Sequence, residues 1–349
     1  MLVLLNPWEC RVRTLLDPAP PKPLTLPRSV LTVQTELRRR AAAGELTLPE
    51  PGHGRTPLRW SALATLGRTD LSLARLAEGH VDAMAILAEA GRMPPQDLVY
   101  GVWAAKAGGT GATLDRASSG LRLTGTVRFC SGAGVLDRAL VAASAPDESG
   151  TAWLIEVDLA APGVLSDPDS WPALGMDASD SLDVRFHDVP ITEPMIIGTD
   201  DWYVRRRGFR LGSGGVAAVW LGGAVGGYDR VLAVLRERGE PDEHQFAHLG
   251  ALASMLSATD ALLANTAHAI DTDEELDLTA AIAAGKSAAE RVGRTIVDIA
   301  PRITGPGPLC WDRGFAQHLA DLAVYIRQHH AERDLAKLGR HLFERGESR

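Results

Sequence analysis

The sequence predicts an α+β fold in three parts: a helical region over residues 1–95, an antiparallel β-domain over 96–197 and a four-helix bundle over 205–349. Apolar residues recur every three or four positions in the first and last parts, which is typical of helices. In the middle part they recur every second position, which is typical of strands. The chain of 349 residues is also long enough to form two or three packed layers.

The N-terminal region contains two expected helices. Proline-rich segments bracket the first, near residues 29–44. The second opens at Thr69 and Asp70, which are favourable residues at a helix N-terminus, and it ends near Gly91, ahead of two prolines. Its apolar stripe has a helical spacing and consists of Leu73, Leu76, His80, Met84 and Leu87.

The middle region changes to an alternating pattern. Residues 121–127 alternate between apolar and polar side chains and follow a Ser-Ser-Gly turn. Many short strands separated by turn residues, with no helical pattern between them, favour an antiparallel barrel or sandwich. The expected strands are residues 98–104, 121–127, 139–144, 151–158 and 181–189.

The C-terminal region has four long helical stretches with short connections, the pattern of an antiparallel bundle. Its first stretch includes Leu211–Tyr228, which has no charged residue and places Gly222 and Gly226 at the spacing of paired membrane helices. The same segment holds seven glycines, which lower its hydrophobicity below that of a usual membrane span. We therefore expect a tightly packed helix and no membrane insertion. The four stretches are residues 212–238, 244–270, 276–300 and 312–343.

Composition narrows the functional class. The net charge of −8 argues against nucleic acid as a partner, because phosphate binding needs a basic surface. Cys10, Cys130 and Cys310 are scattered, with neither a metal-binding spacing nor a disulfide framework, so we expect no metal site and a reducing, cytoplasmic location. The apolar residues 1–5 lack a basic flank and stop at Asn-Pro, so no secretion signal is expected.

Two segments carry a resemblance to a known family. Residues 174–190 combine a turn of short polar side chains with a strand that ends in Phe-His-Asp-Val-Pro. Residues 302–330 begin with Arg-Ile-Thr-Gly-Pro-Gly-Pro, continue through Asp321 and Tyr325, and end at two histidines. In this order the segments resemble the acyl-CoA dehydrogenase superfamily, whose fold has an N-terminal helical domain, a middle β-domain and a C-terminal four-helix bundle.

The resemblance implies a flavin site. Residues 124–134 match the family segment that passes beneath the flavin, so Phe129 is expected against the isoalloxazine ring and Ser131 near flavin N5, with Cys130 between them. A flavin needs an aromatic or apolar wall and a few placed polar groups, and this segment supplies both. The cofactor implied is FAD, or FMN if the enzyme is of the monooxygenase type.

Two further segments extend this expectation. Residues 100–111 resemble a second flavin-contacting segment, in which Tyr100 agrees with the family and Trp103 replaces a threonine. Gly305 and Gly307 match the loop that holds the cofactor's pyrophosphate and adenosine half across a subunit interface, which implies a homodimer or homotetramer.

The family's catalytic glutamate is missing. Its position falls on His329, or on His330 if the alignment shifts by one residue. Flavin monooxygenases of the same fold carry a histidine in the helix that here contains His80 and another near the glutamate position. The resemblance therefore implies all three histidines as candidate catalytic residues, since a neutral imidazole accepts a proton near neutral pH. The alternatives are an exposed helix turn for the adjacent pair and a satisfied core residue for His80, with Glu332 as the nearest carboxylate.

Three functions stay open. The first is an FAD-dependent oxidoreductase that oxidises an acyl thioester, the usual substrate of the family. The second is a flavin-dependent monooxygenase that acts on another small molecule and uses histidines in place of the glutamate base. The third is a non-catalytic protein that keeps the fold for binding or assembly.

Overall fold

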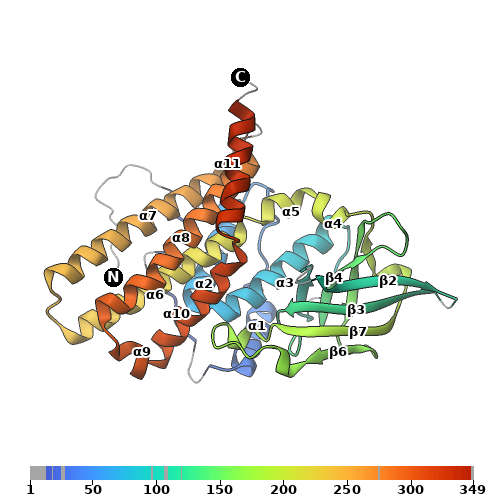
Figure 1. The fold of residues 1–349 in the computed structure, drawn as a ribbon, viewed down its shortest axis with the longest axis horizontal. Helices are drawn as coiled ribbons and strands as arrows, with labels where there is room; N and C mark the ends of the chain where they lie inside the picture. Colours follow the sequence, from blue (N-terminus) through green and yellow to red (C-terminus); the bar gives the residue numbers. More distant parts are fainter. Residues whose placement is uncertain are drawn as a thin grey trace.

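The computed structural model describes residues 13–17, 19–24, 28–95, 97–105, 109–118, 120–273 and 276–346. A bundle of long helices forms one side of the molecule and a β-sheet forms the other (Figure 1). Helix α3 (Leu71–Glu89) lies between them and contacts both strand β1 and helix α10. This is the three-part α+β architecture that the sequence predicts.

The N-terminal helices follow their capping residues. Helix α1 (Val30–Ala42) begins at Ser29, whose side chain forms a capping box with Thr32, and α3 begins after Asp70, whose carboxylate accepts a hydrogen bond from Leu73 N. Helix α2 (Thr56–Thr69) was not predicted. It starts with proline in its first turn, where proline is tolerated, and it is buried on so many sides that no polar face marks a helical period.

The β-domain is one eight-stranded sheet with the order β6-β7-β3-β2-β4-β5-β8, and β1 is added beside β4. Most pairings are antiparallel as expected, but β4 pairs in parallel with both β1 and β2, so the sheet is mixed. Strands β2, β6 and β8 were not predicted. The strands are β1 (Tyr100–Trp103), β2 (Gly111–Ala117), β3 (Gly120–Cys130), β4 (Arg138–Ser144), β5 (Ala152–Asp158), β6 (Val164–Asp167), β7 (Leu182–Ile191) and β8 (Ile196–Gly198).

The C-terminal region forms the expected bundle, with one correction. The continuous helix expected over residues 312–343 is wrong. It is divided into α10 and α11 by a 3-10 turn at Ile326–Gln328 and a loop in which Ala331 has φ 39°. This break matters because the two adjacent candidate histidines, His329 and His330, lie in it. The helices are α4 (Trp202–Arg205), α5 (Arg207–Gly212), α6 (Gly215–Arg238), α7 (Glu243–Thr272), α8 (Leu278–Thr304), α9 (Gly307–Trp311), α10 (Arg313–Tyr325) and α11 (Glu332–Gly346).

Helix α6 confirms the expected tight packing of its glycine-rich half. A Cβ atom built on Gly222 would lie 1.9 Å from the carbonyl oxygen of Ala64 in α2, so only glycine permits this approach. Two helical stretches, Arg207–Arg238 and Glu243–Thr272, are long and apolar enough to cross a membrane by composition alone. The first is mostly buried within the bundle, whereas about one third of the apolar window of the second is buried.

Candidate functional site

A cleft of about 910 Å³ opens where the β-domain, α3 and the α10–α11 connection meet. Its volume lies at the upper end of the range for small-molecule and cofactor sites. The wall is aromatic and apolar on the β-domain side, and its polar groups are hydroxyls, arginines, one glutamine and one histidine. The lining residues are Arg75, Val102, Trp103, Ala104, Ala105, Phe129, Ser131, Trp171, Met176, Ser179, Ser181, Val324, Tyr325, Arg327, Gln328, His330 and Arg333.

The aromatic wall comes from the ends of two β-domain segments. Phe129 and Trp171 meet edge to face, with ring centroids 6.2 Å apart. Phe129 is about half exposed and has φ 59°, a backbone region that non-glycine residues seldom adopt. Trp103 is buried, and its indole nitrogen donates a hydrogen bond to Ser131 O at 3.2 Å. A strained, exposed aromatic residue at a cleft wall is typical of a binding site.

A chain of serine hydroxyls forms the second part of the wall. Ser131 Oγ lies 2.8 Å from Ser181 Oγ, which lies 2.8 Å from Ser179 Oγ. Ser179 Oγ then donates to Met176 O at 2.7 Å. Met176, Ser179 and Ser181 belong to one turn, which has positive φ at Met176 and Asp180. In this turn the Ser181 hydroxyl lies beside Ser131 at the end of β3.

The floor of the cleft is charged. Arg75 and Tyr325 both line it, and both bind the same carboxylate, that of Glu78, which lies behind them. Arg75 Nη1 is 3.1 Å from Glu78 Oε2, Tyr325 donates its hydroxyl hydrogen to that same oxygen, and Arg75 Nε donates to Ser131 Oγ at 3.1 Å. Burial raises the pKa of Tyr325 well above its usual value, and the neighbouring Glu78 raises it further.

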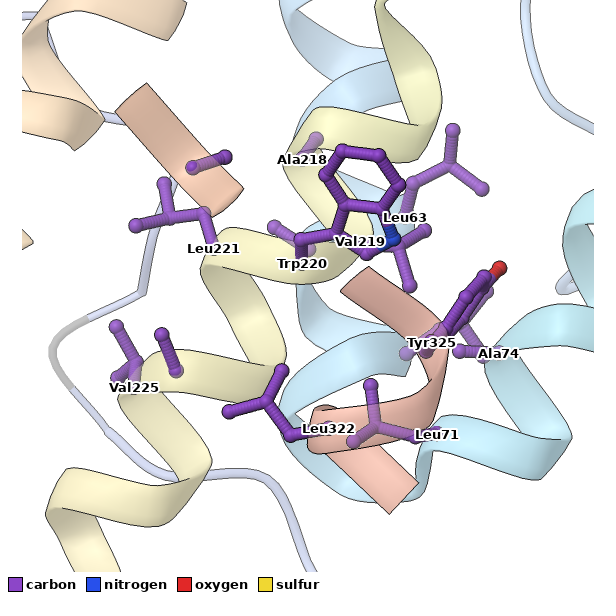
Figure 2. Packing of buried hydrophobic residues seen from close by; sticks show 14 of the residues in the cluster. Leu63, Leu71, Ala74, Ala218, Val219, Trp220, Leu221, Val225, Leu322 and Tyr325 are labelled. Atoms are coloured by element: carbon purple, nitrogen blue, oxygen red, sulfur yellow. The ribbon is translucent and has the colours of Figure 1, made fainter. Parts of the chain in front are cut away.

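The ring of Tyr325 is fixed by the hydrophobic core. It meets Trp220 of α6 edge to face at 6.4 Å, and Figure 2 shows it beside Ala74 of α3 and one helical turn from Leu322. Because packing restricts the ring, the direction of the hydroxyl group is set in advance of any ligand.

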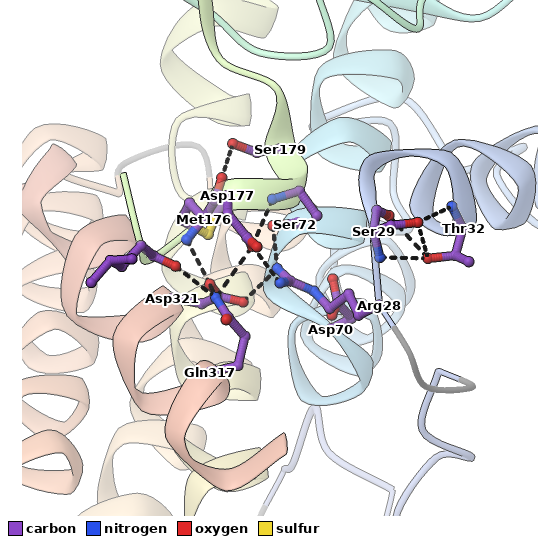
Figure 3. Close-up of polar contacts among 12 residues, drawn as sticks. Arg28, Ser29, Thr32, Asp70, Ser72, Met176, Asp177, Ser179, Gln317 and Asp321 are labelled. Carbon is purple, nitrogen blue, oxygen red and sulfur yellow. Dashed lines mark hydrogen bonds and ion pairs between the residues drawn. The ribbon is translucent and has the colours of Figure 1, made fainter. Parts of the chain in front are cut away.

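An arginine-centred cluster supports the opposite side of the serine chain (Figure 3). Arg28 pairs with Asp70 of α3 at 2.7 Å, Asp177 at 2.5 Å and Asp321 of α10 at 2.6 Å. Burial alone would lower the pKa of Arg28, but the three carboxylates together raise it. Asp321 in turn accepts a hydrogen bond from the backbone nitrogen of Met176, and its pKa is raised by burial to about 7. The cluster thus joins α3, α10 and the turn that carries the cleft serines.

The three candidate histidines are not brought together. His330 lines the cleft, where its backbone nitrogen donates to Asp334 Oδ2 at 2.9 Å. His329 faces a separate cavity of about 320 Å³ between α5, α8 and α11 and is not among the residues that line the cleft, so this geometry does not support its expected contact with a flavin there. Its Nδ1 accepts from Ala331 N, which leaves Nε2 as the protonated nitrogen that faces Ser287 Oγ at 3.1 Å. Burial lowers the pKa of His329.

His80 also lies outside the residues that line the cleft. Its Nδ1 accepts a hydrogen bond from Tyr100 N at 3.3 Å, between α3 and β1. Burial lowers its pKa to about 4, so the ring is neutral at physiological pH. These surroundings favour the alternative interpretation of His80, a satisfied core residue.

Of the remaining residues expected to contact the cofactor, some line the cleft and others do not. Trp103, Phe129 and Ser131 line the cleft, whereas Tyr100 is a buried residue of β1 outside the cleft lining and its hydroxyl donates a hydrogen bond to Glu156 Oε1 at 2.9 Å. Cys130 points into the β-domain core, where burial raises its pKa. The two glycines of the bundle loop lie away from this cleft. Gly305 is at the C-terminal end of α8, and Gly307 opens α9.

Several cleft residues were missed in the sequence. Arg75 and Glu78 belong to the helix in which only His80 was considered, although Arg75-x-x-Glu78 is the spacing of a side-chain pair on one helical face. Trp171 precedes the matched motif by a few residues and carries no local signal. Arg327 and Arg333 flank the two histidines. Arg327 was not considered, and Arg333 was considered only as a sign that the turn is solvated.

Sequence comparison finds no matching protein-family profile and no matching curated protein. Structure comparison finds many similar solved structures. A complex of TdsC from Paenibacillus sp. A11-2 with FMN and indole has a TM-score of 0.74 at 18% identity, covering 89% of this chain and 94% of that chain. KijD3 in complex with FMN and dTDP-3-amino-2,3,6-trideoxy-4-keto-3-methyl-D-glucose has a TM-score of 0.74 at 21% identity, covering 88% and 84%.

A nitrososynthase from Micromonospora carbonacea var. africana has a TM-score of 0.71 at 17% identity, covering 91% of this chain and 93% of that chain. At these identities the likeness establishes the fold and leaves the reaction to the chemistry of the site. The chain therefore has the acyl-CoA dehydrogenase-like fold that its sequence predicts.

Proposed function

We propose that this protein is a flavin-dependent oxygenase that holds FMN in the cleft between the β-domain and α10 and acts on a small organic molecule. One observation carries the proposal. Among the described residues that line the cleft, the polar side chains are three arginines, four hydroxyl groups, one glutamine and one histidine, and there is no aspartate or glutamate. A dehydrogenase of acyl thioesters needs a carboxylate in the cleft to remove the proton next to the carbonyl group, so the usual reaction of this fold is disfavoured.

The residues present fit a flavin. Phe129, Trp171 and Trp103 supply aromatic surface, and Ser131 and its neighbours supply placed polar groups. Arg327 and Arg333 supply the positive charge that a flavin phosphate requires. When bound and reduced, a flavin supplies the activation of molecular oxygen.

The chain's own residues have separable roles in this proposal. The aromatic wall orients flat ligands, and the buried floor of Arg75 and Tyr325 excludes water from one end of the cleft. His330, at the rim and next to Asp334, holds or releases a proton at an imidazole nitrogen. We assign no such role to His329, whose two ring nitrogens are engaged by Ala331 N and Ser287 Oγ, or to His80, which lies outside the cleft lining and accepts at Nδ1 from Tyr100 N.

The structural neighbours favour the same class. One TdsC structure is described as a dibenzothiophene monooxygenase, and TdsC and KijD3 were each solved with FMN. Oxidation of an acyl thioester by FAD and a non-catalytic role stay as the competing functions, and the experiments below separate all three.

The first experiment measures flavin binding to the purified protein by quenching of flavin fluorescence, with FMN and FAD in parallel. Replacing Ser131 with tryptophan should fill the cleft wall and reduce FMN occupancy strongly. Ser149→Trp, on an exposed turn between β4 and β5, is the matched control and should bind as the wild type does. Equal binding by both variants would remove the cofactor from this cleft, and no binding of either flavin by the wild type would favour a non-catalytic role.

The second experiment identifies the reaction. Flavin-loaded protein is reduced by NADH through an added flavin reductase, and oxygen uptake and hydroxylated products are measured with indole as the trial substrate. In a parallel anaerobic cuvette, a panel of acyl-CoA thioesters is added to the oxidised protein. Bleaching of the flavin by a thioester would replace the oxygenase proposal with a dehydrogenase. His330→Ala should lower turnover about 10²–10⁴-fold if His330 transfers a proton in the reaction.

A further inference from the structure

A second cavity lies apart from the cleft, between α5, α8 and α11. Its volume is about 320 Å³, at the lower end of the range for small-molecule sites. None of the described residues that line it also lines the cleft. The proposed flavin-dependent function uses only the cleft, so this cavity has no role assigned so far.

One face of α8 gives the cavity an apolar part and a charged part. Leu278, Ile282 and Lys286 follow one another at a spacing of four residues, so they lie on the same face of the helix over about two turns. Ile282 is buried, and Phe209 of α5 and Leu338 of α11 extend the apolar surface. A ligand that lies along α8 therefore meets apolar side chains at one end and an amine at the other.

The charged part is positive, although the chain as a whole is negative. The sequence has four lysines and a net charge of −8. Two of these lysines, Lys286 and Lys337, line the cavity together with Arg210. Asp334 is the one carboxylate among the described lining residues, and it lies 3.4 Å from the amine of Lys337. The lining thus sets three cations against one carboxylate, which favours an anionic ligand.

Lys286 is the partly buried cation of this lining, whereas Arg210 and Lys337 are exposed. Within the described part of the chain, the amine of Lys286 forms no hydrogen bond or ion pair. Burial lowers the pKa of Lys286, and the attraction of the more distant Asp334 offsets this only in part. An anion bound beside the amine would supply the countercharge that the protein does not.

His329 adds a neutral surface and no charge. Its Nδ1 accepts from Ala331 N, and its Nε2 donates to Ser287 Oγ, which in turn donates to Ala283 O. Burial lowers the pKa of His329, so the ring stays neutral. Recognition of a negative charge in this cavity is therefore left to Lys286 and the two exposed cations.

We propose that this cavity binds a small organic anion, whose charged group pairs with Lys286 and whose apolar body lies along Leu278 and Ile282. The inference goes beyond the proposed function, since it requires neither a flavin nor any residue of the cleft. A neutral ligand would leave the amine without a partner, and an inorganic anion would leave the apolar face in water. A ligand with both parts satisfies both surfaces.

Two ligands of the same shape test the requirement for charge. 4-Isopropylbenzoate carries a carboxylate, and 4-isopropylbenzamide has a neutral amide in its place. Isothermal titration of the protein as purified, and again with saturating FMN, should show about 10- to 100-fold tighter binding of the carboxylate, the range for a hydrogen bond to a charged group. Equal affinities, or no measurable binding of the carboxylate, would overturn the inference.

Lys286→Met keeps the length of the side chain and removes its charge. It should weaken binding of the carboxylate by about 10- to 100-fold and leave binding of the amide unchanged. Arg340→Met is the matched control, because Arg340 is an exposed cation of α11 outside the cavity lining. This control should bind as the wild type does. A carboxylate affinity that survives Lys286→Met would place the anion elsewhere and refute the assignment.

Lysine footprinting localises the ligand on the wild-type protein, even if Lys286→Met does not fold. Because the chain has four lysines, reductive methylation read by mass spectrometry resolves each of them. The carboxylate should slow methylation of Lys286 several-fold and leave the exposed Lys22 unchanged. No protection of Lys286, or an amine that resists methylation without ligand, would contradict the proposal. Flavin binding is scored separately by fluorescence quenching, so a failure of FMN to bind would overturn the proposed function alone.

Discussion

Replacing Arg28 with alanine should destabilise the protein strongly, and the loss should depend on pH. The Arg28 side chain is 8% exposed and pairs with three carboxylates, of which Asp70 and Asp321 are also buried. Removing one partner from a buried ion pair leaves an uncompensated charge, which costs about 3–5 kcal/mol. We expect a loss of this size in the free energy of unfolding at pH 8.

The pH dependence follows from Asp321. Burial raises its pKa to about 7, above the value of about 3.9 for an unfolded aspartate. Between these values the folded state binds more protons than the unfolded state, so the contribution of Asp321 to stability falls as the pH rises toward 7. Without Arg28 the carboxyl group loses the attraction that lowers its pKa. At pH 5 it is then neutral, and the cost of Arg28→Ala should shrink to about 1–2 kcal/mol, the scale of lost hydrogen bonds.

Urea unfolding followed by tryptophan fluorescence at pH 5 and pH 8 measures both values. Arg38→Ala is the control, since Arg38 makes a two-pronged pair with Asp137 in which both side chains are partly exposed. Solvent screening should limit its cost to about 1 kcal/mol or less, with little change between the two pH values. Equal costs of Arg28→Ala at pH 5 and pH 8 would show that Asp321 does not take up a proton in the folded variant.

Two further predictions concern the frame of the site. Gly222→Ala should destabilise the protein by about 1–3 kcal/mol or more in thermal unfolding, because the added Cβ would lie 1.9 Å from Ala64 O. Gly250→Ala, on the exposed face of α7, is the control. Its added Cβ meets nothing within 4 Å, so it should be neutral or slightly stabilising in the same experiment. Burial lowers the pKa of His80 to about 4. The contribution of His80 to the free energy of unfolding is therefore complete above about pH 6.5 and falls by about 3 kcal/mol as the pH drops toward 4. His80→Asn, which can still accept from Tyr100 N, should flatten the acid side of the stability profile, and an unchanged profile would contradict the burial of His80.

The fold could be predicted where an element carries a local signal in its sequence. Strand β7 alternates between buried and more exposed positions, so its period of two is visible. Helix α3 is mostly buried, but its N-terminal Asp70 and its regularly spaced apolar residues mark it as a helix. Helix α2 has almost no exposed face, and β8 has three residues, so neither produces a period. The parallel pairing of β4 with β1 and β2 depends on contacts between distant segments, and no local pattern encodes it.

The cleft residues at the end of a strand could be predicted from the sequence, whereas those at the break between α10 and α11 could not. Phe129 and Ser131 stand at the end of β3, so a match in sequence also placed them in space. The two adjacent histidines could not be ranked without the break at residues 326–331. There the extended backbone of His329 sends its ring between α5 and α8 and leaves His330 on the cleft.

The missing glutamate and the arginine-rich cleft belong to one electrostatic arrangement. A carboxylate in the cleft would repel the phosphate of a flavin and would compete with it for the arginines. This chain instead keeps a carboxylate, Glu78, one layer behind the surface, where Arg75 balances its charge and Tyr325 donates a hydrogen bond to it. Among the described residues, the cleft lining therefore presents no carboxylate to an anionic cofactor and none that could remove a C–H proton next to a carbonyl group. For this physical reason we infer that an oxygenase suits this cleft better than a dehydrogenase.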